Sequence, residues 1–147
     1  MQGSLLDILR QDAAPAGVGL AGVMPSIRAA MARVAKGYPE GRKALPEAIS
    51  EVAAREGIAL TPKGGKSISL EILEKWLQAG DREHTPRLEA ILCFCVAAQD
   101  FSPLAPLWRA CGLAVVPAAE LPLLEYGKAC DAEKKAKERK RKIGAML

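Results

Sequence analysis

Two stretches of this sequence decide its fold: LPEAISEVAAREG at residues 45–57 and ISLEILEKWL at residues 68–77. In both, apolar residues recur three or four positions apart, which is the spacing of one buried helix face. These residues are Leu45, Ile49, Val52 and Ala53 in the first stretch and Leu70, Leu73, Trp76 and Leu77 in the second. Pro46 suits the first turn of a helix, and Ser69 is a good N-cap. We therefore predict two short amphipathic helices, at 45–56 and 69–79.

The same spacing recurs on both sides of these stretches. Further helices are predicted at 4–12, from Ile27 to the Gly37-Tyr38-Pro39 break, from Thr85 with Pro86 at its first position, from Ser102 to Gly112, and from about Leu121 onwards. The helix from Thr85 is apolar almost all round, so we expect it to be central and Leu92 to be buried. Trp76 and Trp108 are assigned to the core rather than to base stacking.

Composition agrees with a helical protein. Only 4% of the residues are aromatic, which argues against a β-sandwich or barrel, and good helix formers dominate the 147 residues. This length fits one compact domain with an appendage. The predicted fold is therefore all-α, a compact bundle of about five short helices followed by a C-terminal basic helix. Its predicted parts are a short helix and linker at 1–24, the bundle at 25–116, and the last helix with its basic tail at 117–147.

The basic residues are concentrated in the tail. Residues 133–142 hold seven basic and two acidic residues, a net charge of +5, whereas the rest of the chain holds 14 basic and 15 acidic residues. Such a run is either an ordinary solvated helix end or an arm that binds a polyanion.

Nothing in the sequence suggests catalysis. His84 is the single histidine, and Cys93, Cys95, Cys111 and Cys130 lack the spacing of a zinc site. We therefore expect no enzyme activity, no metal, no cofactor and no small-molecule substrate. There is no run of about 18 uncharged apolar residues and no visible secretory signal, so we expect a cytoplasmic protein without a membrane partner.

The order of the helices resembles a known family. The segments 45–53 and 68–77, supported by 84–96 and 101–113, resemble the helix-turn-helix domain of phage-type repressors, the Cro/CI-like or lambda-repressor-like regulators. In particular, they are similar to regulators from Mu-like prophages. The resemblance covers about residues 25–113 and implies a sequence-specific DNA-binding transcriptional regulator. The family's turn is usually about 3–4 residues long, whereas residues 57–68 give twelve here, which would form a wing-like loop or displace the recognition helix.

The resemblance also implies a DNA site. The helix at 69–79, capped by Ser69, would lie in the major groove, where Lys75 would reach guanine or a phosphate and Gln78 would pair with adenine. Glu71 would accept from a cytosine amino group or complement the helix dipole. The residues expected to hold phosphates are Lys63, Lys66, Arg82, His84 and Arg87, together with the tail residues Lys134, Lys135, Lys137, Arg139, Lys140, Arg141 and Lys142. The alternative for all of them is an ordinary solvated surface charge.

The partners implied by the resemblance are double-stranded DNA and, by analogy with symmetric half-sites, a second copy of the chain. A rival hypothesis is an all-α protein–protein adaptor whose basic tail binds an acidic partner. The net charge of −1 outside the tail favours this rival, because dedicated DNA-binding domains are usually basic.

Overall fold

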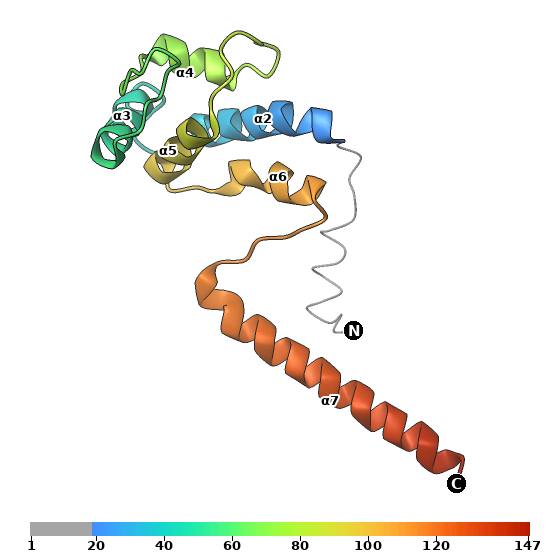
Figure 1. Cartoon of the computed structure of the whole chain (residues 1–147). Helices are drawn as coiled ribbons and strands as arrows, with labels where there is room; N and C mark the ends of the chain where they lie inside the picture. Colours follow the sequence, from blue (N-terminus) through green and yellow to red (C-terminus); the bar gives the residue numbers. More distant parts are fainter. Residues whose placement is uncertain (1–18) are drawn as a thin grey trace. The chain divides into compact units, whose positions relative to one another are not determined.

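The computed structural model describes residues 19–147 of the chain (Figure 1). The helices in this range are α2 (Val23–Lys36), α3 (Leu45–Glu56), α4 (Leu70–Leu77), α5 (Leu88–Ala98), α6 (Ala105–Ala110) and α7 (Leu121–Ala145). Three short 3-10 turns are η1 (Leu20–Gly22), η2 (Ser102–Leu104) and η3 (Ala118–Glu120). The described residues contain no strand, so an all-α fold is confirmed for them. The helix predicted at 4–12 lies outside the described residues.

Residues 19–111 form one compact unit around a single apolar core. Helix α5 packs on α3, while α2 contacts α4, η2 and α6, and Figure 1 shows α2 and α6 side by side. The largest fully buried side chains of the described residues are Phe94, Met31, Leu45, Ile49, Leu73, Ile91, Pro103, Cys93 and Cys95. These side chains come from α2, α3, α4, α5 and η2, so no single helix pair can form this core alone.

The ends of α3 and the start of α4 follow from local sequence. Gly57 adopts the left-handed conformation (φ 68°), and the N–H of Ile58 donates to the Ala53 carbonyl at 2.9 Å, as the glycine cap predicts. The Ser69 hydroxyl accepts from the N–H of Ile72 at 3.3 Å and caps α4. Helix α4 ends at Leu77, two residues before the predicted end.

Helix α5 begins at Leu88, so the start predicted at Thr85 is wrong. Upstream of Thr85, one carboxylate oxygen of Asp81 accepts from the N–H groups of Glu83 and His84 at 2.9 and 3.0 Å. This side chain turns the chain before the predicted start of the helix. Arg87, in an extended conformation, then becomes the N-cap of α5. The helix predicted at 102–112 is also shorter, because η2 and then α6 occupy only Ser102–Ala110.

Two burial predictions are wrong. Leu92 is 39% exposed, and it lies between Leu88 (58%) and Val96 (40%) at intervals of four residues, so these three form an exposed apolar stripe on α5. Trp108 is 36% exposed, whereas Trp76 is buried as predicted. Because apolar residues lie on almost every face of α5, the sequence does not indicate which face packs against α3.

Residues 112–147 form the second unit, in which η3 leads into α7. Helix α7 is continuous over 25 residues and none of its side chains is buried. The predicted helix from Leu121 into the basic tail is confirmed. No helix within residues 19–147 combines the length and the apolar character that crossing a membrane requires.

Candidate functional site

Helix α4 has an apolar face toward the core and a polar face toward solvent. Leu73, Trp76 and Leu77 are buried, whereas Glu71 is exposed and Lys75 is partly exposed. The two residues that flank the helix, Ser69 and Gln78, are exposed as well. Gln78 is the extended C-cap residue rather than a helical residue, so its side chain is not set by helical geometry.

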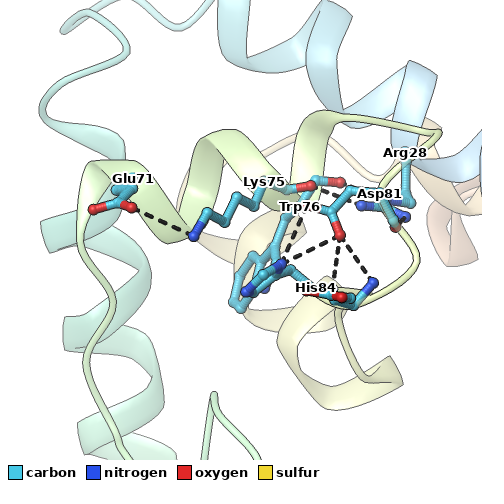
Figure 2. A network of polar contacts seen from close by, with 7 residues as sticks. Arg28, Glu71, Lys75, Trp76, Asp81 and His84 are labelled. Carbon is cyan, nitrogen blue, oxygen red and sulfur yellow. Dashed lines mark hydrogen bonds and ion pairs between the residues drawn. The ribbon is translucent and has the colours of Figure 1, made fainter.

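Glu71 and Lys75 form an ion pair across one turn of α4, with 3.3 Å between the carboxylate oxygen and Nζ (Figure 2). The Glu71 side chain is 79% exposed, so solvent screens the pair and it contributes little to stability. The pairing nevertheless offsets the positive charge of Lys75 at the centre of the predicted recognition face. A phosphate or a base that binds Lys75 would have to compete with this carboxylate.

Arg28 fixes the C-terminal end of α4. Its Nε donates to the Trp76 carbonyl and its Nη2 to the Lys75 carbonyl, both at 2.7 Å, and its Nη1 donates to the Asp81 carbonyl (Figure 2). The Trp76 carbonyl lies in the last turn of the helix, where carbonyls lack an intrahelical partner, whereas the Lys75 carbonyl also accepts from the N–H of Gln78 at 3.2 Å. Arg28 is 3% exposed and is the single buried charged side chain of residues 19–147.

Burial lowers the pKa of the Arg28 guanidinium, and the charge of Asp81 acts in the opposite direction. An arginine retains its proton in proteins nonetheless, so Arg28 is a buried cation. Sequence reasoning missed this residue. The available signal was its position in α2, three residues before Met31 and seven before Ala35, both of which are buried.

The start of α4 is tied to α3 through Ser50. The Ser50 hydroxyl donates to the Pro46 carbonyl at 2.8 Å and accepts from the N–H of Ile68 at 3.0 Å. This bond holds the residue that precedes the Ser69 cap. Helix α4 is therefore fixed at both ends, by Ser50 through Ile68 and by Arg28.

The long segment between α3 and α4 is anchored in the core. Leu60 and Ile68 are buried, and the Gly65 carbonyl accepts from the N–H groups of Leu60 and Thr61 at 2.7 and 3.2 Å. The Thr61 hydroxyl in turn accepts from the N–H of Gly65 at 3.0 Å. These bonds close a tight turn. The two predicted phosphate ligands of this segment, Lys63 and Lys66, are exposed.

Three predicted phosphate ligands lie between α4 and α5. Arg82 and Arg87 are exposed, but His84 is already engaged, because its Nδ1 lies 3.2 Å from the Asp81 carboxylate (Figure 2). The backbone hydrogen bond from His84 is the largest cause that lowers the pKa of Asp81. His84 therefore belongs to the turn that leads into α5 as well as to the predicted site.

All seven basic residues of the tail are exposed on α7. Two of them form exposed ion pairs within that helix, Lys135 with Asp131 at 2.9 Å and Lys137 with Glu133 at 3.1 Å. Consecutive residues of a helix are about 100° apart around the axis, so basic residues at 134, 135, 137 and 139–142 point in many directions. The positive charge therefore surrounds α7 instead of forming one face.

The cysteines lie in two different environments. Cys93 and Cys95 are buried, and burial is the main cause that raises the pKa of each thiol, to about 11 for Cys95. Cys111 and Cys130 are exposed and free. Among the described residues, no group of three histidine, cysteine or acidic side chains is placed to hold a metal ion.

The predicted site is thus a fixed short helix with a polar outer surface, next to exposed lysines and arginines on the flanking turns. Neither a protein-family model, nor a curated protein, nor a solved structure matches this chain.

Proposed function

We propose that this protein is a sequence-specific DNA-binding transcriptional regulator of the phage or prophage type, a repressor in its simplest form. The observation that carries the proposal is the mounting of α4, which is held at both ends by Ser50 and Arg28. A helix that reads bases needs such support, because its side chains must be placed to within a fraction of an ångström. The exposed positions of α4 and its two cap residues are the polar Ser69, Glu71 and Gln78.

In this proposal α4 enters the major groove. On its outer face, Lys75 exchanges Glu71 for guanine or a phosphate, and Gln78 contacts adenine. The exchange is inexpensive because the Glu71–Lys75 pair is exposed. Lys63 and Lys66 on the preceding turn contact the DNA backbone.

Arg82, His84 and Arg87 on the following turn would contact phosphates as well. Such contacts position a protein on DNA without reading sequence. The seven basic residues of the tail, all on α7, would add a further phosphate-binding arm. Its charge surrounds the helix, so it requires no particular orientation toward the duplex. In a cytoplasmic homodimer, two copies would read two half-sites; catalysis, cofactors and small-molecule substrates have no part in this function.

The proposal is tested by incubating the full chain with sheared genomic DNA and sequencing the fragments that it retains. The informative variant is Lys75→Ala/Gln78→Ala, which should change stability by less than about 0.5 kcal/mol per site. It should lose about 1–3 kcal/mol of specific binding for each base contact and little non-specific binding. Retention of the full sequence preference would show that α4 is not the recognition helix.

The matched control is Lys63→Ala/Lys66→Ala. This variant should weaken binding to all sequences alike, and each lost phosphate contact should lower the salt slope by about 0.9. Competition binding at several salt concentrations separates the two patterns. Identical behaviour of the two double variants would contradict the division into base and phosphate contacts.

A second candidate function is the protein–protein adaptor. The observation in its favour is the exposed apolar stripe of Leu88, Leu92 and Val96, together with a basic tail that suits an acidic partner. The adaptor hypothesis expects Leu92→Glu to abolish recovery of an acidic partner protein while Lys75→Ala/Gln78→Ala leaves it unchanged. Sequence-dependent DNA enrichment that Leu92→Glu does not affect would reject it.

A further inference from the structure

A surface pocket of about 370 Å³ lies between the first turn of α2 and the turn that follows α4. This volume is in the range of small-ligand sites and exceeds what one phosphate group needs. Met24 and Pro25 form one wall, and the opposite wall runs from Ala79 to Arg82 and includes Thr85. Gly80, Arg82 and Thr85 are exposed, so the pocket opens to solvent.

Arg28 forms part of this pocket although it is almost completely buried. A guanidinium has five N–H donors, and the bonds to Lys75, Trp76 and Asp81 use three of them. All three acceptors are neutral carbonyls, and the opposing charge that acts on Arg28 is that of Asp81, whose carboxylate pairs with His84 at 3.2 Å. Buried charges usually have a partner of opposite sign. An anion would reach the Arg28 guanidinium from the pocket.

The remaining wall adds a second cation and a hydroxyl. Arg82 is exposed and lines the pocket, and Thr85 supplies a side-chain donor. Asp81 adds one negative charge to the lining, where its carboxylate accepts from the N–H groups of Glu83 and His84 and contacts the His84 ring, so the two arginines leave the lining with a net charge of +1.

We propose that this pocket binds a phosphate group, with Arg82 and Thr85 in contact with its oxygens and Arg28 supplying the buried positive charge. The source of the phosphate is either a DNA backbone or a free phosphate. Binding of a DNA phosphate rests on the proposed function, whereas binding of a phosphate group in the pocket does not depend on it. If the source is DNA, the pocket is the contact that sets the position of the C-terminal end of α4 on the duplex.

Inorganic phosphate is the first probe. It is titrated into the full chain at constant ionic strength, with chloride as the reference anion, while the melting temperature and the backbone amide resonances are recorded. Phosphate should raise the melting temperature more than chloride, and the largest resonance shifts should fall on Gly80, Arg82 and Thr85. Arg82→Ala should raise the dissociation constant about tenfold, as expected for one lost hydrogen bond to a charged group.

The matched control is Arg33→Ala, which removes an exposed arginine of α2 that neither lines the pocket nor belongs to the proposed DNA site. It should leave the phosphate titration unchanged, and Arg82→Lys should restore part of the affinity. Phosphate that acts no differently from chloride would overturn the proposal. So would an equal loss of phosphate affinity in Arg82→Ala and Arg33→Ala.

A random-sequence DNA duplex is the second probe, used at low salt. If the phosphate is that of DNA, Arg82→Ala should weaken duplex binding more than Arg33→Ala does, and inorganic phosphate should compete with the duplex. If the pocket binds inorganic phosphate but the chain does not bind the duplex, the pocket is supported with a free phosphate as its source. The same result refutes the DNA function. A chain that binds duplex without any pocket response to phosphate refutes the pocket alone.

Discussion

Replacing Arg28 by methionine tests the structural argument most directly, because the change keeps a long side chain and removes all three hydrogen bonds to carbonyls. The bond to the Trp76 carbonyl is buried, whereas the bonds to the Lys75 and Asp81 carbonyls are partly buried. An acceptor left unsatisfied in the interior costs about 1–3 kcal/mol. Water can replace the two outer bonds in part, at about 0.5–1 kcal/mol each. The sum is a loss of about 2–5 kcal/mol in the free energy of unfolding.

The loss is measured by urea denaturation, followed by far-ultraviolet circular dichroism of the full chain. The midpoint should fall while the slope of the unfolding free energy against urea stays constant. Arg33→Met is the control, because Arg33 is an exposed arginine on the same helix, and this substitution should change stability by less than about 0.5 kcal/mol. Arg28→Lys should give an intermediate loss, since a single ammonium cannot reproduce the planar fork.

One result would refute this reasoning. Replacing buried ion pairs by apolar side chains is often neutral or stabilising, because both charged partners leave the interior together. At Arg28 the acceptors are backbone carbonyls that stay behind when the arginine is removed. Stability of Arg28→Met within about 0.5 kcal/mol of the wild type would mean that these carbonyls find water or a new donor, and that α4 does not depend on Arg28.

Three further predictions concern the core, the pH dependence and the tail. Leu73→Ala should cost about 2–5 kcal/mol because its side chain is fully buried, whereas Leu92→Ala should cost about 1 kcal/mol because its side chain is 39% exposed; equal costs in urea denaturation would contradict the assignment of the α5 faces. The pKa of Asp81 is lower in the folded chain than in the unfolded chain, so its contribution to stability is present above the unfolded pKa and lost as the pH falls through the folded value. The melting temperature of Asp81→Asn should therefore fall less steeply than that of the wild type as the pH is lowered below about 4, and parallel curves would exclude this role. Deletion of the chain after Asp131 should leave the melting temperature of the 19–111 unit unchanged and weaken binding to all duplexes about equally; unchanged affinity at low salt would remove the tail from the mechanism.

Much of the candidate site was readable from residue types and spacing. Ser69 as a cap, the polar outer positions Glu71 and Lys75, and the exposed Lys63 and Lys66 follow from helical spacing and from a glycine-rich loop. The ion pair between Glu71 and Lys75 was also within reach, because opposite charges four residues apart on a helix are neighbours. Arg28 was not predictable in this way, because its acceptors lie 47 to 53 residues further along the chain.

The sequence by itself determined the local features of this protein: that the described residues are helical, that α3 ends at Gly57, that α4 starts after Ser69, and that α7 is basic. Each follows from interactions between residues a few positions apart, which are present wherever the rest of the chain lies. Only the tertiary structure decided which face of α5 is buried, because that helix is apolar on every side and α3 can cover only one of them. It also brought the Arg28 cation to the end of α4 and formed the pocket beside it, since both depend on packing between segments that are distant in the sequence.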